Sequence, residues 1–188
     1  MTVQLKRRRF TLDQYHRMGQ TGILGADDRV ELVQGEIVEL SAIQSRHAGT
    51  VARLSHLFST RLDRRAVVWS QNPLLLTQHQ SEALPDLMLL VPRADFYAGG
   101  LPEPPSVRLL VEVADESLYY DRQKKLPLYA RGGVAESWLA NVDTRRLEIH
   151  RTPGRLRYRS VRLPTPTETF APAAFPDVKL TLRDLFGV

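Results

Sequence analysis

The sequence predicts an α/β (α+β) fold in which helices flank a mixed central β-sheet, with an N-terminal β-hairpin and C-terminal β-hairpins. Apolar runs with the length of buried strands lie in the middle of the chain, and segments with helical periodicity precede and follow them. Short turn signals separate paired strand-like runs near both ends. A chain in which strand-like runs alternate with helical segments is typical of a sheet with helices packed on it.

Length and composition indicate one globular unit. The chain has 188 residues, with 43% hydrophobic and 25% charged residues, which are ordinary values for a globular protein. We expect a basic arm over residues 1–9 and a single domain over 10–188. The absence of cysteine excludes disulfides, cysteine nucleophiles and cysteine-bound zinc.

Hydropathy gives no sign of a membrane or secreted protein. No stretch approaches the roughly 18 apolar residues of a membrane span. The basic Lys6–Arg9 segment is not followed by the apolar segment of a signal peptide. We therefore expect a cytoplasmic protein with no membrane contact.

The positive net charge of the chain is compatible with a polyanionic partner. The formal net charge is +5, and the chain holds 22 arginines against 4 lysines. A basic surface attracts polyanions, and the guanidinium group suits phosphate recognition. A GC-rich genome would give the same arginine excess, so the charge alone leaves nucleic-acid binding open.

The first third of the chain predicts a helix, a hairpin and a longer helix. Thr11 can cap a short helix over about 11–19, and residues 29–40 predict a β-hairpin with its turn at Gln34-Gly35. The clearest amphipathic helix spans 46–63. Its apolar residues recur at helical spacing: Val51, Leu54, Leu57, Phe58 and Leu62.

The remainder predicts strands around one further helix. Strand-like runs lie at 66–69, 74–77, 84–91 and 107–114, and again at 135–142, 146–151 and 156–162. Residues 92–105 form a long loop rich in proline and glycine. Residues 118–131 predict a helix closed by Gly132-Gly133, and Pro127 inside it implies a late start or a kink. A short final element at 178–185 follows a proline-rich stretch.

Two carboxylates in apolar strands are the strongest functional signal. Asp86 follows Pro85 at the start of an apolar run that predicts a central strand. Glu112 lies within another such run, where alternation places it on the same face as Leu110 and Ala114. A buried carboxylate is costly unless it is paired, protonated or bound to a cation. We expect both on adjacent strands of one sheet, where they can share a hard divalent metal.

Each of these residues also has a structural interpretation. Asp86 can cap a strand or pair with an arginine, and Glu112 can form a buried ion pair with an arginine. Lys124 and Lys125 can be exposed helix lysines, and the i, i+4 spacing of Asp121 and Lys125 alone can explain that pair.

Two residues outside these strands, Glu31 and His47, also have structural interpretations. Glu31 lies between Val30 and Leu32, which places its side chain on the less apolar face of the hairpin. His47 opens the long helix and is more often a solvated or capping residue than a site residue. No glycine-rich phosphate loop, G-x-S-x-G or H-E-x-x-H motif offers a rival site, and the five histidines lack metal-ligand spacing.

The ordered set of motifs resembles the PD-(D/E)XK nuclease superfamily, and within it the Uma-two branch of bacterial proteins usually labelled restriction endonucleases. Each motif is weak alone, but the set runs from about residue 10 to the end of the chain. The matching stretches are 29–39, His47, Pro85-Asp86, Val111–Val113, Tyr120-Asp121 with Lys125, 126–138 and 178–186.

The resemblance implies roles for five positions. Asp86 and Glu112 would be the metal-binding carboxylates, with the Val113 carbonyl as a further ligand. Lys125 would be the catalytic lysine, and Glu31 an additional acidic residue. The superfamily's simple pattern places its lysine two residues after the second carboxylate, where this chain has Ala114. The choice between Lys124 and Lys125 therefore stays open.

The implied function is a metal-dependent DNA endonuclease with a restriction-endonuclease-like core. Mg²⁺ or Mn²⁺ suits carboxylate oxygens and water. The expected substrate is double-stranded DNA. Because cleavage of a duplex needs two sites that face two strands, we also expect a homodimer, with the edges of the C-terminal hairpins at 135–162 and an exposed Trp138 or Tyr158 available for pairing. Two alternatives remain: a catalytically silent nucleic-acid-binding or dimerisation module with this fold, and a small-molecule metal-dependent hydrolase.

Overall fold

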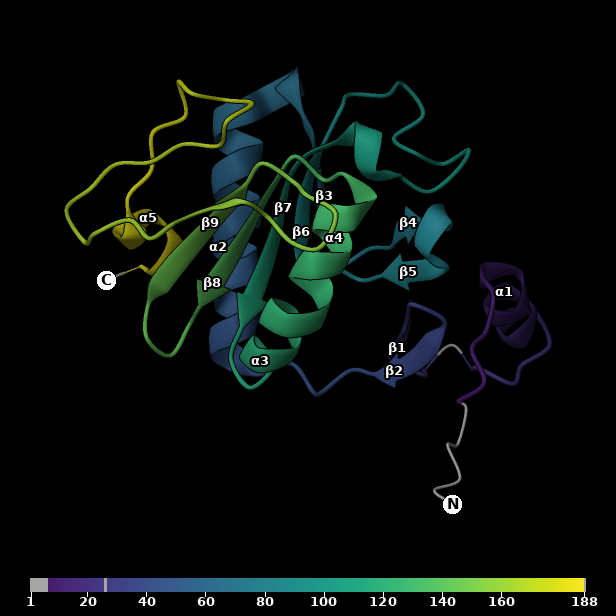
Figure 1. Cartoon of the computed structure of the whole chain (residues 1–188). Helices are drawn as coiled ribbons and strands as arrows, with labels where there is room; N and C mark the ends of the chain where they lie inside the picture. Colours follow the sequence, from purple (N-terminus) through teal and green to yellow (C-terminus); the bar gives the residue numbers. More distant parts are fainter. Residues whose placement is uncertain (1–6, 26, 188) are drawn as a thin grey trace, which may run out of the picture.

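A six-stranded mixed sheet forms the centre of the protein (Figure 1). The computed structural model describes residues 7–25 and 27–187. Its strand order is β10-β9-β8-β7-β6-β3, and only the β7–β8 pair is parallel. The strands are β3 (Val67–Ser70), β6 (Leu87–Leu90), β7 (Val107–Ala114), β8 (Glu136–Asn141), β9 (Arg146–Arg151) and β10 (Ser160–Arg162). The predicted mixed central sheet is confirmed.

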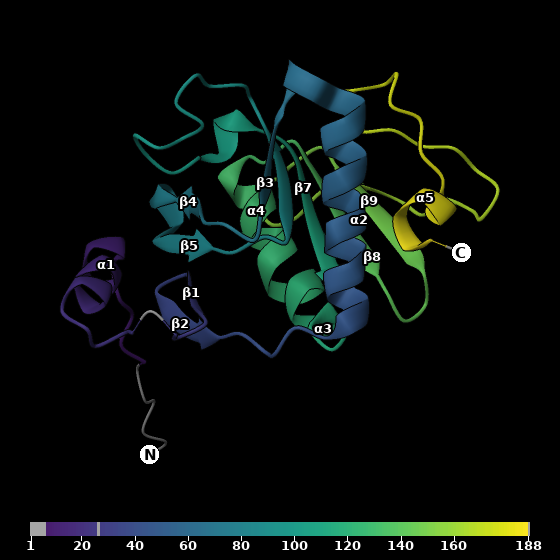
Figure 2. The ribbon, with the colours of Figure 1, turned by 180° about the vertical axis from the view of Figure 1, so that it is seen from behind.

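Helices cover the two faces of this sheet, as Figures 1 and 2 show from opposite sides. The long helix α2 (Ser45–Leu62) lies on one face, with the short helix α5 (Leu182–Phe186) beside it. The other face carries one continuous helical run. It consists of α3 (Leu118–Tyr120), a π-helical segment (Asp121–Lys125) and α4 (Leu126–Gly132). Alternate residues of β6 and β7 fill separate apolar cores under the two layers.

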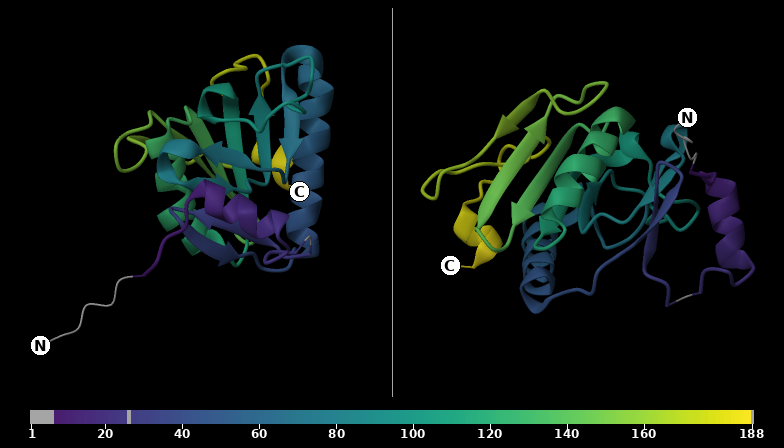
Figure 3. Two further views of the ribbon diagram at one scale, coloured as in Figure 1. Left: turned by 90° about the vertical axis from the view of Figure 1, so that its right-hand side faces the viewer. Right: turned by 60° about the horizontal axis from the view of Figure 1, so that its bottom comes forward.

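A second, smaller sheet lies beside the first, and helix α1 (Leu12–Gln20) lies beyond it at the end of the molecule remote from β9 (Figure 3). Its antiparallel order is β2-β1-β5-β4. The strands are β1 (Val30–Val33), β2 (Glu36–Glu39), β4 (Leu74–Leu76) and β5 (Ser81–Ala83). Single 3-10 turns occupy Asp63–Arg65, Thr77–His79 and Pro104–Ser106. The sequence did not predict β5, because three residues are too few for a periodic pattern.

The N-terminal hairpin and both main helical segments form where the sequence predicts them. Gln34 (φ 53°) and Gly35 (φ 80°) make the tight turn between β1 and β2. The helix predicted over 118–131 begins at Leu118, so a late start is wrong. Pro127 has no N–H, and its ring would clash with the carbonyl four residues earlier in a regular helix. The wider π turn over Asp121–Lys125 closes with the Leu126 N–H donating to the Asp121 carbonyl, immediately before Pro127, and removes this conflict.

The C-terminal part corrects two predictions. Trp138 and Tyr158 are buried, so neither is exposed for pairing with a second chain. The Trp138 ring packs against Phe58 and Phe170, with centroids 6.2 and 5.5 Å away. The Tyr158 hydroxyl donates to the Val134 carbonyl at 2.9 Å. The strand predicted over 156–162 is reduced to β10, because the chain turns to anchor Tyr158.

The predicted basic arm over residues 1–9 can be compared with the structure only from residue 7 onward. Residues 1–6 of the predicted basic arm lie outside the described residues. Arg9 is described, and its guanidinium donates to the Gln34 carbonyl at 2.9 Å. No helix in the described part of the chain has the length and apolar character to cross a membrane.

We expect Gly35→Ala to lower the free energy of unfolding by more than about 1 kcal/mol, because Gly35 has a positive φ and an added Cβ would lie 2.8 Å from the Arg9 Cβ. Urea unfolding followed by circular dichroism measures the change. Gly49→Ala is the matched control, because that glycine lies within α2 with open space around it, and it should raise stability by about 0.5–1 kcal/mol. Equal effects of the two variants would contradict the role assigned to the turn.

Candidate active site

The two predicted carboxylates lie on neighbouring strands. Asp86 comes immediately before β6, and the antiparallel register pairs Leu87 with Val111 of β7. Continued by one residue, this register sets Asp86 opposite Glu112. The N–H of the next residue, Val113, donates to Asp86 Oδ2 at 2.8 Å. Glu112 points to the α4 side of the sheet, where Leu110 and Ala114 also lie, as alternation predicts.

Lys125, and not Lys124, reaches these carboxylates. The Lys125 side chain is buried, with 5% exposed, and its Nζ lies 2.9 Å from Glu112 Oε1 and 3.5 Å from Glu31 Oε2. It also donates to the Leu84 carbonyl at 3.3 Å. Lys124 is exposed. The i, i+4 pairing with Asp121 is not what holds Lys125, since Glu112 and Glu31 are its ion-pair partners.

Glu31 occupies a different position from the one predicted. The sequence places it on the less apolar face of the hairpin, but strand β1 is buried on both faces at this point and the Glu31 side chain is fully buried. Its Oε2 accepts from the Leu84 N–H at 3.0 Å, and its Oε1 accepts from the Tyr120 hydroxyl at 3.1 Å. Glu31 therefore links the small sheet to the helical run and to Lys125.

Three further residues join the site: His47 and Asp121, for which the sequence favours structural roles, and Tyr129, which the sequence does not single out. His47 of α2 has its Nε2 3.0 Å from Asp86 Oδ1. The Tyr129 hydroxyl donates to Glu112 Oε1 at 2.5 Å. Asp121 is buried at the start of the π-helical segment. The spacing of Asp121, Lys125 and Tyr129 at four-residue intervals was the available signal, because such residues share one helix face.

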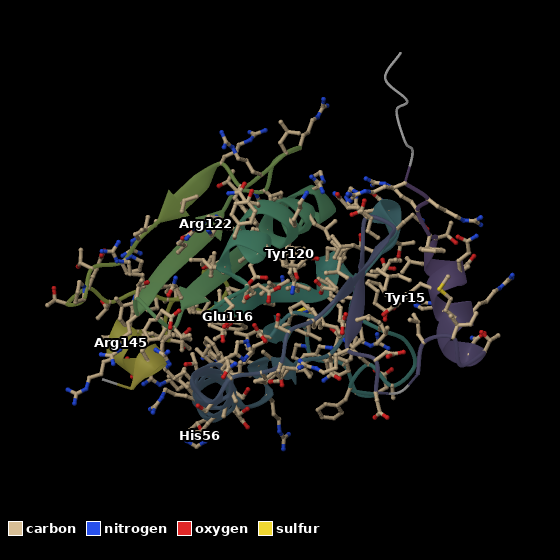
Figure 4. All side chains as sticks on the ribbon, turned by 90° about the horizontal axis from the view of Figure 1, so that it is seen from below. Tyr15, His56, Glu116, Tyr120, Arg122 and Arg145 are labelled. Atoms are coloured by element: carbon tan, nitrogen blue, oxygen red, sulfur yellow. The ribbon has the colours of Figure 1, made fainter. Side chains whose placement is uncertain are left out.

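Several of these side chains border a pocket of about 600 Å³ between the loop after β2, the start of α2, the start of β6, the end of β7 and the first turn of the helical run. Figure 4 shows Glu116 and Tyr120 from this region at the middle of the lower face. Seven carboxylates line the pocket, against one arginine and one histidine. They belong to Asp28, Glu39, Asp86, Glu112, Asp115, Glu116 and Asp121. The pocket therefore favours cations and repels a bare phosphate.

Burial and mutual charge set the ionisation of the site. Burial raises the pKa of Glu112 well above its ordinary value, and the Lys125 ammonium opposes this shift. Burial alone would lower the pKa of Lys125, but the charges of Glu112, Glu31 and nearby aspartates raise it well above its ordinary value. Lys125 is therefore held in the charged form. Burial raises the pKa of Asp121 to about 6.

The donor set fits a hard divalent metal bound in part by water. In the described part of the chain no cluster of three or more His, Asp or Glu side chains is arranged to hold a metal alone. Asp86 and Glu112 supply two carboxylates at the wall of one acidic pocket. Mg²⁺ is commonly bound through one or two carboxylates, several waters and substrate phosphates. Two carboxylates are therefore enough for this class of site.

The fold is that of a nuclease-like α/β protein known from a crystal structure. That structure is described as a "putative nuclease belonging to DUF820" from Anabaena variabilis ATCC 29413. The two chains superpose with a TM-score of 0.76 at 15% sequence identity, over 95% of this chain and 98% of the other.

Sequence comparison identifies the family. Residues 12–183 match the Uma2 family, whose description is "Putative restriction endonuclease", and the chain belongs to this family. The predicted Uma-two resemblance is thereby confirmed. A comparison with curated proteins found no match.

We expect Asp121→Asn to raise the melting temperature at pH 8 and to leave it nearly unchanged at pH 4. A carboxyl whose pKa is about 6 when folded and 3.8 otherwise destabilises the fold above pH 6, by at most about 3 kcal/mol, and this penalty vanishes as the pH falls toward 3.8. Thermal unfolding at both pH values measures it.

The control for this experiment is Asp63→Asn, the same change at an exposed position after α2, which should alter stability by less than about 0.5 kcal/mol at either pH. A loss of stability in Asp121→Asn at pH 8 would show that the Asp121 charge supports the fold.

Proposed function

We propose that the protein is a metal-dependent endonuclease that hydrolyses phosphodiester bonds of double-stranded DNA. One observation carries the proposal: Asp86, just before β6, and Glu112, in the adjacent strand β7, line one acidic pocket, and the buried Lys125 ammonium lies 2.9 Å from Glu112. Family membership and the nuclease-like fold support it.

The carboxylates of Asp86 and Glu112, with the Val113 carbonyl, would hold Mg²⁺ or Mn²⁺. When bound, the metal would neutralise charge on the phosphate and lower the pKa of a water. The remaining residues orient these ligands. His47 and the Val113 N–H bind the two oxygens of Asp86, while Tyr129 and Lys125 bind one oxygen of Glu112. Hydrogen bonds of this kind fix a ligand's rotamer and leave it pre-oriented.

Lys125 acts through its charge. The residue does not line the pocket, and its ammonium lies behind Glu112 and the Leu84 carbonyl. There it keeps Glu112 ionised and stabilises negative charge that develops on the phosphate, which is most effective in a site of low dielectric. Glu31 is a positioning residue for Lys125, because Leu84 and Tyr120 already hold its two oxygens.

DNA would lie across the face that carries the pocket. A second cavity of about 410 Å³ shares Asp115 and Glu116 with the first and continues toward the β8–β9 turn. Arg46 borders it, and the exposed Arg145 lies at the same turn (Figure 4). Arginines around an acidic centre can hold phosphates on either side of the scissile bond without reading sequence. A cytoplasmic location is part of the proposal, because that is where the proposed DNA substrate would be met.

The test is nicking of supercoiled DNA with Mg²⁺ or Mn²⁺, compared with a chelator. We expect cleavage by the natural chain and at least a 100-fold loss in Asp86→Asn and Glu112→Gln, because both changes remove a negative ligand. Cleavage that persists in the chelator would contradict metal dependence. If the natural chain binds DNA and never cleaves it, the silent-module alternative holds; if it neither binds nor cleaves, the small-molecule hydrolase is favoured.

The lysine assignment has a matched pair of variants. We expect Lys125→Met to lower the nicking rate at least 10-fold, because it removes the ammonium beside Glu112 and keeps the volume of the side chain. Lys124→Met should cleave at the natural rate, since Lys124 is exposed. Circular dichroism verifies that both variants fold. If Lys124→Met slows nicking and Lys125→Met does not, Lys124 is the catalytic lysine.

The proposal includes a homodimer, because cleavage of a duplex needs two sites that face two strands. The buried Trp138 and Tyr158 cannot form its interface. The edge strand β10 is the better candidate, since all three of its residues are exposed and its outer hydrogen-bonding groups face no further strand in the sheet. Light scattering at micromolar concentration should give about twice the chain mass of 21.4 kDa, and a monomer mass would contradict the dimer.

A further inference from the structure

Asp121 is a buried carboxylate that the proposed roles leave unused. It opens the π-helical segment, only 3% of it is exposed, and it lines the same pocket as Asp86 and Glu112. The π turn allows Asp121 and Lys125 both to be buried against the sheet. Turns of this kind are rare and frequently occur at functional sites.

The contacts of Asp121 do not explain its burial. Its Oδ2 accepts from the Ser117 hydroxyl at 2.6 Å. Within residues 7–25 and 27–187 no basic side chain lies within ion-pair distance of it, although the chain holds 26 lysines and arginines. An aspartate buried for structure alone would be expected to pair with a cation, because an unpaired buried charge is strongly unfavourable.

Asp86 and Glu112, which also line the pocket, would be taken by the metal and by the hydrogen bonds that orient them. Both oxygens of Asp86 accept hydrogen bonds, from His47 and from the Val113 N–H. Glu112 accepts from Lys125 and Tyr129. Glu31 does not line the pocket. Asp121 therefore combines pocket access with a carboxylate oxygen, Oδ1, that has no hydrogen bond to any described residue.

We infer that Asp121 is the general base that takes a proton from the water attacking the scissile phosphate. The inference rests on the proposed nuclease function and deepens it. One O–H bond of the water breaks, and its proton goes to a carboxylate oxygen of Asp121. The water oxygen forms a bond to phosphorus as the bond from phosphorus to the leaving deoxyribose oxygen breaks. The leaving oxygen takes a proton from solvent, and Asp121 later releases its own.

The ionisation of Asp121 suits this role. Its pKa of about 6, raised by burial, leaves it ionised at neutral pH and a stronger base than an ordinary aspartate. The charged groups that act on it come from every neighbouring element. They are Lys125 on the helical run, Glu112 on β7, Asp86 before β6, Glu31 on β1 and His47 on α2. Ser117 donates to the ionised form and lowers the pKa.

The test is the initial rate of nicking between pH 5 and 9, at saturating Mg²⁺. We expect the natural chain to lose activity as the pH falls, because protonated Asp121 cannot accept the proton of the attacking water. Asp121→Asn should be at least 100-fold slower at pH 8 and should lose this acidic limb, because it cannot accept the proton. Ser117→Ala should move the limb to higher pH, because it removes the hydrogen bond that favours the ionised form. The exposed Asp63→Asn should match the natural chain.

Two outcomes would overturn the inference. If Asp121→Asn keeps the natural acidic limb, whether its rate is normal or reduced, the limb belongs to another group and Asp121 is at most structural. If Glu112→Gln abolishes cleavage while Asp121→Asn keeps the natural acidic limb, the nuclease proposal stands without Asp121 as base. Absence of cleavage by the natural chain at every pH would overturn the nuclease proposal and this inference together.

Discussion

The buried ammonium of Lys125 is the interaction on which the rest of the structure depends. It lies between Glu112 of the large sheet and Glu31 of the small sheet, and it comes from the helical run packed on the large sheet. Three separate elements therefore meet at one cation. An ammonium buried without partners would be too costly to keep charged, and either carboxylate alone would be costly as well. The geometry of each element is consequently tied to that of the other two.

This constraint explains features that look unrelated in the sequence. Glu31 can reach Lys125 only if the β1–β2 hairpin docks beside the helical run, which the hydrogen bond from Tyr120 secures. Lys125 can point at the sheet only if the helix passes Pro127 without breaking, and the π turn permits this. A buried ion network of this kind contributes less to stability than to a single arrangement of its members. The proposed chemistry depends on this single arrangement of Glu31, Glu112 and Lys125 more than on any gain in the stability of the fold.

The fold was largely predictable from the sequence, and the site was predictable in part. Strand alternation placed Glu112 on the correct face, and apolar runs of strand length placed Asp86 at the entrance of its neighbour. Both are local properties. The burial of Glu31 was not predicted, because the hairpin considered alone has one face that is expected to contact solvent. In the fold the rest of the small sheet and the helical run cover that face. The prediction of an exposed Trp138 is wrong for the same reason, since Phe170, which packs against it, lies far along the chain.

The hydrogen-bond partners of Asp86 and Glu112 could not be predicted from local sequence patterns. His47 and Tyr129 have no distinctive neighbours in sequence, and their roles follow from a helix crossing one face of the sheet and another helix covering the opposite face. Asp121 differs from them, because its four-residue spacing to Lys125 suggested a surface ion pair that the fold does not form. In a chain with net charge +5, a pocket lined by seven carboxylates is a concentration of unfavourable charge. Residues that only stabilised the fold would include more cations there, so the acidity of the pocket is best understood as a requirement of what binds in it.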